Sequence, residues 1–110
     1  MVKFVGKAKQ GGVRMVVGSH TWVPYAEMGF AYFREMELLR DAGLSNMEII
    51  QAATIENACF FRIEERLGSL EKGKIADLIV VEGDPLKDIK AMRHVKKVML
   101  NGLWVSSARP

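Results

Sequence analysis

The sequence predicts an α/β fold that ends in a small β-rich appendage, and three observations support this prediction. A buried-strand pattern at 13–17 follows a helix-like segment and a Gly-Gly stop, which is the order of an α/β unit. Helical periodicity then runs through the middle of the chain. From residue 67 onward, the pattern changes to short strands and tight turns. The 110 residues, 49% hydrophobic and 26% charged, indicate one small globular domain.

The first twenty-one residues predict a helix, a strand and then a polar loop. Val2 to Gln10 reads as the tail of a helix, which Gly11-Gly12 would end. Val13 to Val17 is mostly apolar and β-branched, which favours a strand covered on both faces. Gly18 to Thr21 follows at once, and loops at the carboxyl ends of such strands hold ligands and chemistry. His20 is therefore the candidate catalytic residue, because neutral imidazole binds metals and its ordinary pKa suits proton transfer near neutrality.

Aromatic residues continue this loop around Pro24. Trp22 and Tyr25 could line a pocket beside His20, or they could pack the loop onto the body of the protein. Both interpretations fit the pattern.

Three helices are predicted in the middle of the chain. The first runs over about 27–42, with an apolar stripe at three- and four-residue spacing and charged residues, Glu37 among them, on the wet side. Ser45 and Glu48 form a capping box that starts the second helix. Thr54 caps a third, from Ile55 to about Arg62, in which we expect Ala58, Phe60 and Phe61 to turn inward.

Paired carboxylates on these helices could be proposed as acid/base pairs. The pairs are Glu35 with Glu37 and Glu64 with Glu65. Charged residues on amphipathic helices usually form the solvated face, which is the interpretation we favour here.

The last third predicts a small antiparallel sheet. Ile75 to Val81 reads as a strand, a turn follows at 82–85, and Val95 to Leu100 reads as a second strand. Asn101-Gly102 is a strong signal for a type I′ hairpin, with Leu103 to Ser106 as the returning strand. We expect His94, between two basic residues, to be solvated. The boundary between the two parts is expected between residues 66 and 67, giving segments 1–66 and 67–110.

Composition argues against several classes of function. The net charge of +3 is spread along the chain and interleaved with acidic residues, so no nucleic-acid partner is expected. No apolar run approaches the ~20 residues that cross a bilayer, so no membrane association is expected. A single cysteine, Cys59, and the absence of a signal-peptide pattern predict a cytoplasmic location.

Four stretches in order resemble the C-terminal end of the amidohydrolase superfamily, most closely the imidazolonepropionase and Xaa-Pro dipeptidase-like branch. They correspond to the eighth strand of a TIM barrel, two family helices, the family's G-x-x-x-x-G-K-x-A-D-L stretch and a closing hairpin. In this sequence they read VRMVVGSH, REMELLRDAGLSNMEIIQAATIENA, LGSLEKGKIADLIVVEGDPLKDI and VKKVMLNGLWV. The resemblance implies a C-terminal fragment of a TIM-barrel amidohydrolase, with the last barrel strand and its helices in 1–66. It implies part of a β-sandwich-like appendage in 67–110, tied to the barrel by Lys74 and Asp77.

The resemblance also implies a site at the end of the predicted strand. The family usually has an aspartate there that binds the metal and acts as general acid/base, and this sequence has His20 in its place. Imidazole can coordinate zinc or carry a proton, so His20 is the expected metal ligand and catalytic residue. Loss of the site is the alternative. Ser19 and Thr21 would shape the substrate site, and Trp22 and Tyr25 would line its mouth.

The family's other metal ligands come from strands that this sequence does not contain, since a complete barrel takes roughly 250 residues. A catalytic zinc needs about three protein ligands, so one histidine cannot assemble the site. We therefore expect a fragment or truncated relative that is inactive alone. A complete protein would use a divalent metal, with zinc foremost, to hydrolyse C–N bonds of small amides, dipeptides or cyclic amides. The alternative is a non-catalytic oligomeric or interaction module, because unpaired strand edges favour a homo-oligomer.

Overall fold

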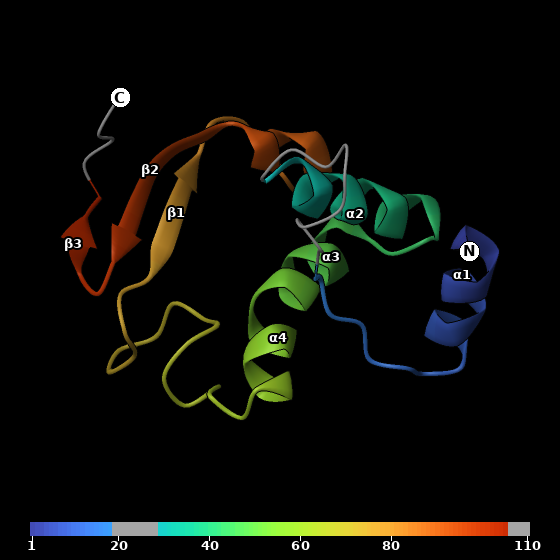
Figure 1. Ribbon diagram of the computed structural model, residues 1–110, viewed down its shortest axis with the longest axis horizontal. Coiled ribbons are helices and arrows are strands. Elements are labelled where there is room, and N and C mark those ends of the chain that lie inside the picture. The colour runs from blue at the N-terminus through green and yellow to red at the C-terminus, as the bar shows by residue number, and fades with distance from the viewer. Residues whose placement is uncertain (19–28, 106–110) are drawn as a thin grey trace.

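The computed structural model describes residues 1–18 and 29–105, which form helices followed by a three-stranded sheet (Figure 1). The sheet lies at one end of the molecule and the first helix at the other, with the remaining α-helices between them. In chain order the elements are α1 (Val2–Gln10), α2 (Phe30–Asp41), α3 (Asn46–Ala53), α4 (Ile55–Phe60), β1 (Leu78–Val81), the 3-10 helix η1 (Ile89–Arg93), β2 (Val95–Leu100) and β3 (Leu103–Trp104).

The structure corrects the predicted strand at 13–17. These residues pair with no strand within the described part of the chain. A strand needs neighbouring strands to pair its backbone N–H and C=O groups, and helices surround this segment instead. The described strands are all antiparallel, in the order β1-β2-β3. The described residues are therefore helices followed by an antiparallel sheet, and the parallel unit of an α/β fold is not among them.

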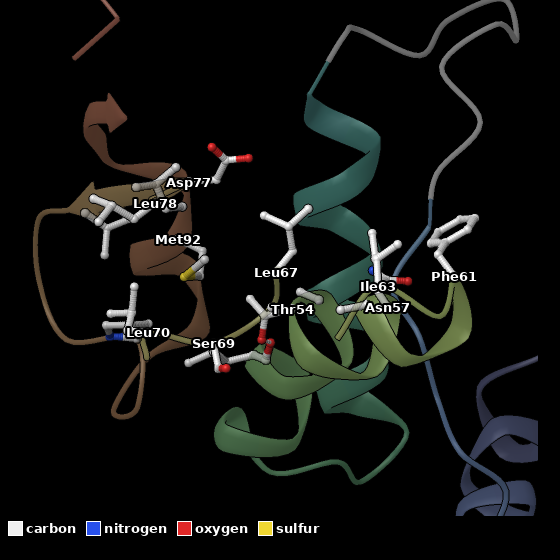
Figure 2. A pocket seen from close by; sticks show the side chains of 17 residues that line it. Thr54, Asn57, Phe61, Ile63, Leu67, Ser69, Leu70, Asp77, Leu78 and Met92 are labelled. Carbon is white, nitrogen blue, oxygen red and sulfur yellow. Dashed lines mark hydrogen bonds between the residues drawn. The ribbon is translucent and has the colours of Figure 1, made fainter. Parts of the chain in front are cut away.

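The sheet does not lie flat on the helices. An apolar groove separates β1 from α3, α4 and the chain that follows α4 (Figure 2). Contact between the helical and β parts runs mainly through η1, which packs beside α2.

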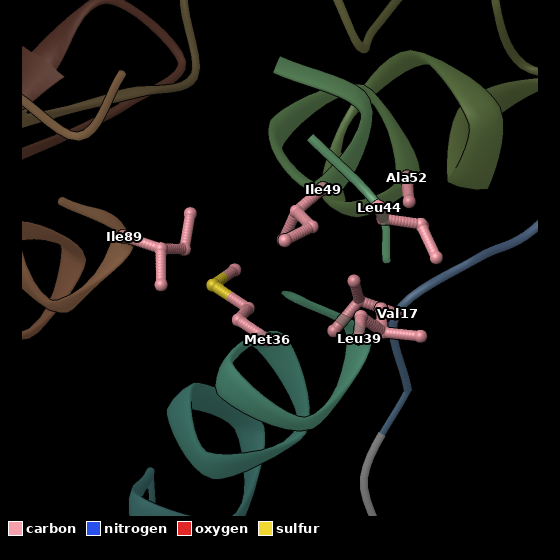
Figure 3. Close-up of a cluster of buried hydrophobic side chains, with 7 residues drawn as sticks. All are labelled: Val17, Met36, Leu39, Leu44, Ile49, Ala52 and Ile89. Atoms are coloured by element: carbon pink, nitrogen blue, oxygen red, sulfur yellow. The ribbon is translucent and has the colours of Figure 1, made fainter. Parts of the chain in front are cut away.

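A small apolar core holds the helices together (Figure 3). Met36 on α2 and Ile49 on α3 are fully buried at its centre, and Tyr32 and Phe33 pack at its margin. The predicted apolar stripe of α2 is thus confirmed. The buried members of the core are Val17, Met36, Leu39, Leu44, Ile49, Ala52 and Ile89.

The start of α3 confirms the predicted capping box. The Ser45 hydroxyl accepts from the Glu48 N–H at 3.2 Å, and the Glu48 carboxylate accepts from the Ser45 N–H at 2.7 Å. Lys9 at the end of α1 donates to the same carboxylate at 2.9 Å and to the Gly43 carbonyl at 2.8 Å. One acidic residue therefore caps α3 and ties α1 to it.

The third predicted helix differs from expectation at both ends. Thr54 occupies the N-cap position, but its hydroxyl donates back to the Ile50 carbonyl at 2.7 Å and caps nothing in α4. Ala58 is buried as predicted, whereas Phe60 and Phe61 are 68% and 66% exposed. The helix ends at Phe60 after six residues, and both phenylalanines lie at its exposed end.

The hairpin forms as the sequence predicts. Asn101 and Gly102 have φ of 50° and 79°, as a type I′ turn requires at both central positions. The Asp77 carboxylate accepts from the Asn101 N–H at 2.6 Å, and Lys74 donates to the Ser69 hydroxyl at 2.6 Å. Lys74 and Asp77 are thus structural, but these bonds lie inside the 67–110 segment.

A salt bridge joins the two parts of the chain. The Arg93 guanidinium on η1 donates twice to one oxygen of Glu37 on α2, at 2.9 and 2.7 Å, and Arg34 binds the other oxygen at 3.0 Å. Arg93 also lies over the rings of Phe30 and Phe33, 4.9 and 5.9 Å from their centroids. Glu37 is therefore not on a wet face as predicted, because its side chain is only 13% exposed. The hydrogen bond from Arg93 holds the pKa of Glu37 below its ordinary value.

Replacing Glu37→Gln should lower the free energy of unfolding by about 1–2 kcal/mol. The amide keeps the shape of the side chain but leaves Arg93 without a charged partner, while solvent screens part of the loss. Urea unfolding measures the change. Glu65→Gln is the control, because Glu65 is exposed and has no ion pair in the described residues, so its change should stay within about 0.5 kcal/mol. Equal losses in the two variants would contradict a specific role for this salt bridge.

The Lys9–Glu48 contact should make the stability of the protein depend on pH in the acidic range. The hydrogen bond from Lys9, followed by that from the Ser45 N–H, lowers the pKa of Glu48 to about 2. A carboxylate with a depressed folded-state pKa stabilises the protein above its unfolded pKa of about 4.3, and this stability is lost as the pH falls toward 2. Glu48→Gln retains a residue type that completes a capping box but removes the charge. Thermal melts across this range should fall more steeply for the wild type than for the variant, and parallel curves would contradict the assignment.

Candidate functional site

The five residues that the sequence predicts for the site lie outside the described residues. These are Ser19, His20, Thr21, Trp22 and Tyr25, all within the gap at 19–28. Their roles remain predictions. The structure does show how the chain is held immediately before them, up to Gly18.

Val17 is clamped between two helices. Its N–H donates to the Ala52 carbonyl on α3 at 3.0 Å, and its carbonyl accepts from the Asn57 amide on α4 at 2.8 Å. The side chain of Val17 is buried in the core beside Leu39 (Figure 3). Both backbone groups of Val17 are therefore paired without a neighbouring strand.

Gly18 is held by α2, which joins α3 and α4 in contacting this part of the backbone. Its N–H donates to the Glu35 carboxylate on α2 at 3.3 Å. Burial raises the pKa of Glu35, and the hydrogen bond from Gly18 opposes this by less. Nearby, the Tyr32 hydroxyl donates to the Ala53 carbonyl at 3.4 Å, and burial raises its pKa. Contacts from α2, α3 and α4 thus define the position of the backbone two residues before His20.

Sequence reasoning missed both side chains that hold this backbone. The sequence pattern predicts a solvated Glu35, and it contains Asn57 only as part of the stretch that resembles two family helices. Asn57 did carry a signal, since asparagine is a weak helix former that often hydrogen-bonds to backbone groups. A carboxylate on a helix gives no comparable signal, because most such residues are solvated.

An apolar groove of about 620 Å³ lies between the helices and β1 (Figure 2). Thr54, Asn57, Phe61, Ile63 and Leu67 lie on its helical side, and Leu78 and Met92 lie across from them. Asp77 is the single ionisable residue among those that line it within the described chain. Its carboxylate already accepts from the Asn101 N–H. The groove is therefore suited to covering apolar groups and offers no free acid or base from these residues.

Metal-binding groups do not gather in the described parts of the chain. Within residues 1–18 and 29–105, no three His, Cys, Asp or Glu side chains lie close enough to hold a metal ion. The described residues alone therefore do not form a donor set for the expected divalent metal. His94 is exposed, as predicted. None of the helices in these two segments is long and apolar enough to span a bilayer.

Comparison with known proteins identifies the family. Residues 4–105 match the model of the Amidohydrolase family, which covers nearly the whole chain. The chain belongs to the amidohydrolase family, and the resemblance noted in its sequence is confirmed.

Individual relatives share only part of their length with this chain. An imidazolonepropionase from Picrophilus torridus is 38% identical over 70 residues, which are 61% of this chain and 18% of that protein. An adenine deaminase from Clostridium botulinum (strain Loch Maree / Type A3) is 36% identical over 66 residues, or 60% of this chain and 10% of that protein. The crystal structure of a Xaa-Pro dipeptidase with bound methionine in the active site matches with a TM-score of 0.87 and 35% identity. That match covers 96% of this chain and 25% of the dipeptidase.

Asn57→Ala should lower the free energy of unfolding by about 1–2 kcal/mol, because the carbonyl of Val17 then lacks a partner at a partly buried position. Asn46→Ala is a matched control, since Asn46 makes the same amide-to-carbonyl bond to Leu86 at 2.9 Å in an exposed setting. The control should lose no more than about 0.5 kcal/mol. Chemical denaturation measures both, and hydrogen exchange at Val17 should accelerate in Asn57→Ala alone. Equal behaviour of the two variants would contradict the clamp.

Proposed function

We propose that this chain is the C-terminal part of a metal-dependent amidohydrolase that hydrolyses C–N bonds of small amides, dipeptides or cyclic amides. The observation that supports it most strongly is the agreement of two matches. The family match spans 4–105, and the backbone matches a Xaa-Pro dipeptidase over 96% of the chain. That relative is named for dipeptide substrates, and we extend the substrate class to this protein as part of the proposal.

In this proposal, residues 1–66 supply the last strand and helices of a (β/α)₈ barrel, and residues 67–110 supply part of a β-sandwich-like appendage. The position of 13–17 supports this assignment. The segment enters the core at Val17, with its backbone held by helices. Strands contributed by the remaining fold would lie beside it and complete the ladder that a barrel requires.

His20 is the proposed catalytic residue and metal ligand, with Ser19, Thr21, Trp22 and Tyr25 around the substrate. A bound divalent metal, with zinc foremost, would supply an activated water at neutral pH. The described residues fix the position of the backbone immediately before this site, because Asn57 and Glu35 hold it at Val17 and Gly18. Since the other ligands would come from strands outside this sequence, the chain alone is proposed to be inactive. Its single cysteine, Cys59, fits a proposed cytoplasmic location.

A second candidate function is a non-catalytic oligomeric module derived from an amidohydrolase. The specific observation in its favour is the number of hydrophobic side chains exposed on the surface. In the described parts of the chain, twenty large hydrophobic side chains are exposed, whereas nine hydrophobic residues are buried. Exposed apolar surface on this scale favours association, so we propose that the isolated chain is a homo-oligomer.

The inactivity of the chain can be tested directly. The purified protein, supplied with zinc or manganese, should show no turnover of Xaa-Pro dipeptides or N-acyl amino acids above that of His20→Ala. His94→Ala is the matched control, because these are the two histidines of the chain. Turnover that His20→Ala abolishes and His94→Ala leaves intact would show that the chain is a working enzyme, and the inactivity proposal would fail.

A further inference from the structure

Helix α2 meets the chain on both sides of the segment that carries the proposed site residues. Before this segment, the Gly18 N–H donates to the Glu35 carboxylate of α2 at 3.3 Å. After it, Gly29 is the N-cap residue of α2 and Phe30 is the first residue of the helix. The described residues that flank 19–28 are therefore both placed by one helix.

The first turn of α2 has few local sources of stability. Gly29 makes no side-chain cap hydrogen bond and has a φ of 83°, and the turn contains no acidic residue. The free N–H groups of a helix N-terminus normally gain from a capping side chain or a nearby negative charge. Phe30, Tyr32 and Phe33 are also weaker helix formers than alanine or leucine. The position of this turn therefore depends on tertiary contacts.

Arg93 supplies such a contact from the β-rich part of the chain. Its guanidinium lies 4.9 Å from the ring centroid of Phe30 and 5.9 Å from that of Phe33. It also donates to the Glu37 carboxylate at 2.9 Å. These three residues are spaced three and four apart, so they share one face of α2. Arg93 therefore holds α2 from its first residue to the turn that contains Glu37.

The other side of α2 holds the backbone that precedes the site. At about 100° per residue, Tyr32 and Glu35 lie nearly opposite the residues that contact Arg93. Glu35 accepts from the Gly18 N–H, and Tyr32 donates to the Ala53 carbonyl at 3.4 Å. Helix α2 thus lies between η1 on one side and Gly18 on the other. A shift of its first turns would move the acceptor of the Gly18 hydrogen bond.

We propose that Arg93 is a positioning residue for the proposed site, because it holds the helix that places both ends of the segment containing His20. The proposal rests on the proposed function only for the role of His20. The contacts that carry it lie within this chain. Arg93 is not needed merely to attach η1, since Ile89 already does so, buried in the core beside Met36 (Figure 3).

Tryptophan fluorescence tests the proposal on the 110-residue chain. Trp104→Phe leaves Trp22, within the site segment, as the single tryptophan, and it alters a residue that is 53% exposed on β3. In this background, Arg93→Leu should lower the fluorescence anisotropy of Trp22 and raise its acrylamide quenching constant, because both ends of the segment are held less firmly. Exchange of the Gly18 amide, followed by NMR, should accelerate about 10-fold as the charged contacts of Arg93 are lost.

Two controls separate positioning from a general loss of stability. Arg34→Leu removes the arginine that binds the other oxygen of Glu37 but lies on α2 itself, and leucine has a similar helix propensity. Ser45→Ala removes the cap of α3 and lowers overall stability without touching Arg93. Under native conditions, both controls should keep the wild-type anisotropy of Trp22 and the wild-type exchange rate of Gly18.

Arg93→Lys provides a milder change for the case in which the leucine variant does not fold. Lysine keeps a positive charge for Glu37 but has no planar group to lie over the two rings. Its anisotropy and Gly18 exchange rate should therefore fall between those of the wild type and Arg93→Leu, with an unchanged circular dichroism spectrum. If the leucine variant is unfolded, a departure of the lysine variant from the wild type in the same direction supports the proposal.

Two results would overturn the proposal. Folded Arg93 variants with unchanged Trp22 anisotropy and Gly18 exchange would show that Arg93 only attaches the β-rich part. Equal changes in Arg34→Leu or Ser45→Ala would show a general loosening of the fold. Neither measurement uses substrate turnover, so its failure leaves the proposed hydrolysis untouched. In turn, a His20 without a catalytic role would leave both measurements unchanged.

Discussion

The backbone at Val17 and Gly18 depends on hydrogen bonds from helices, because no described strand lies beside it. Ala52 and Asn57 pair both polar groups of Val17, and Glu35 accepts from Gly18. Burying Val17 without these partners would leave unpaired backbone groups, which cost stability in an apolar setting. The core can therefore close around Val17 only because three helices supply those partners.

Polar contacts reinforce the joints to elements that contribute little to the small core. Glu48 joins α1 to α3 while it caps α3, and Glu37 joins α2 to η1 through Arg93. The apolar cluster itself gathers mainly around α2 and α3. Each of these carboxylates serves one local and one long-range partner, so a single substitution affects both the helix and the joint between elements.

Features encoded by neighbouring residues were predictable from the sequence. The capping box at Ser45 and the Asn101-Gly102 turn require only residues within one turn of chain, and both formed as expected. The failures concern distant partners. The strand at 13–17 needs neighbours that periodicity cannot supply, and the burial of Glu37 depends on Arg93, 56 residues away. For the same reason the groove was not foreseen, since its walls come from segments far apart in sequence. The predicted site residues themselves lie outside the described parts of the chain.

The exposed rings of Phe60 and Phe61 pack edge to face against each other, with their centroids 5.1 Å apart. Both are largely open to solvent at the end of α4. Molecular chaperones and proteases respond to apolar surface of this kind, and they act continuously on chains that display it. Covering these rings should therefore lower the protein's exposure to chaperones and proteases.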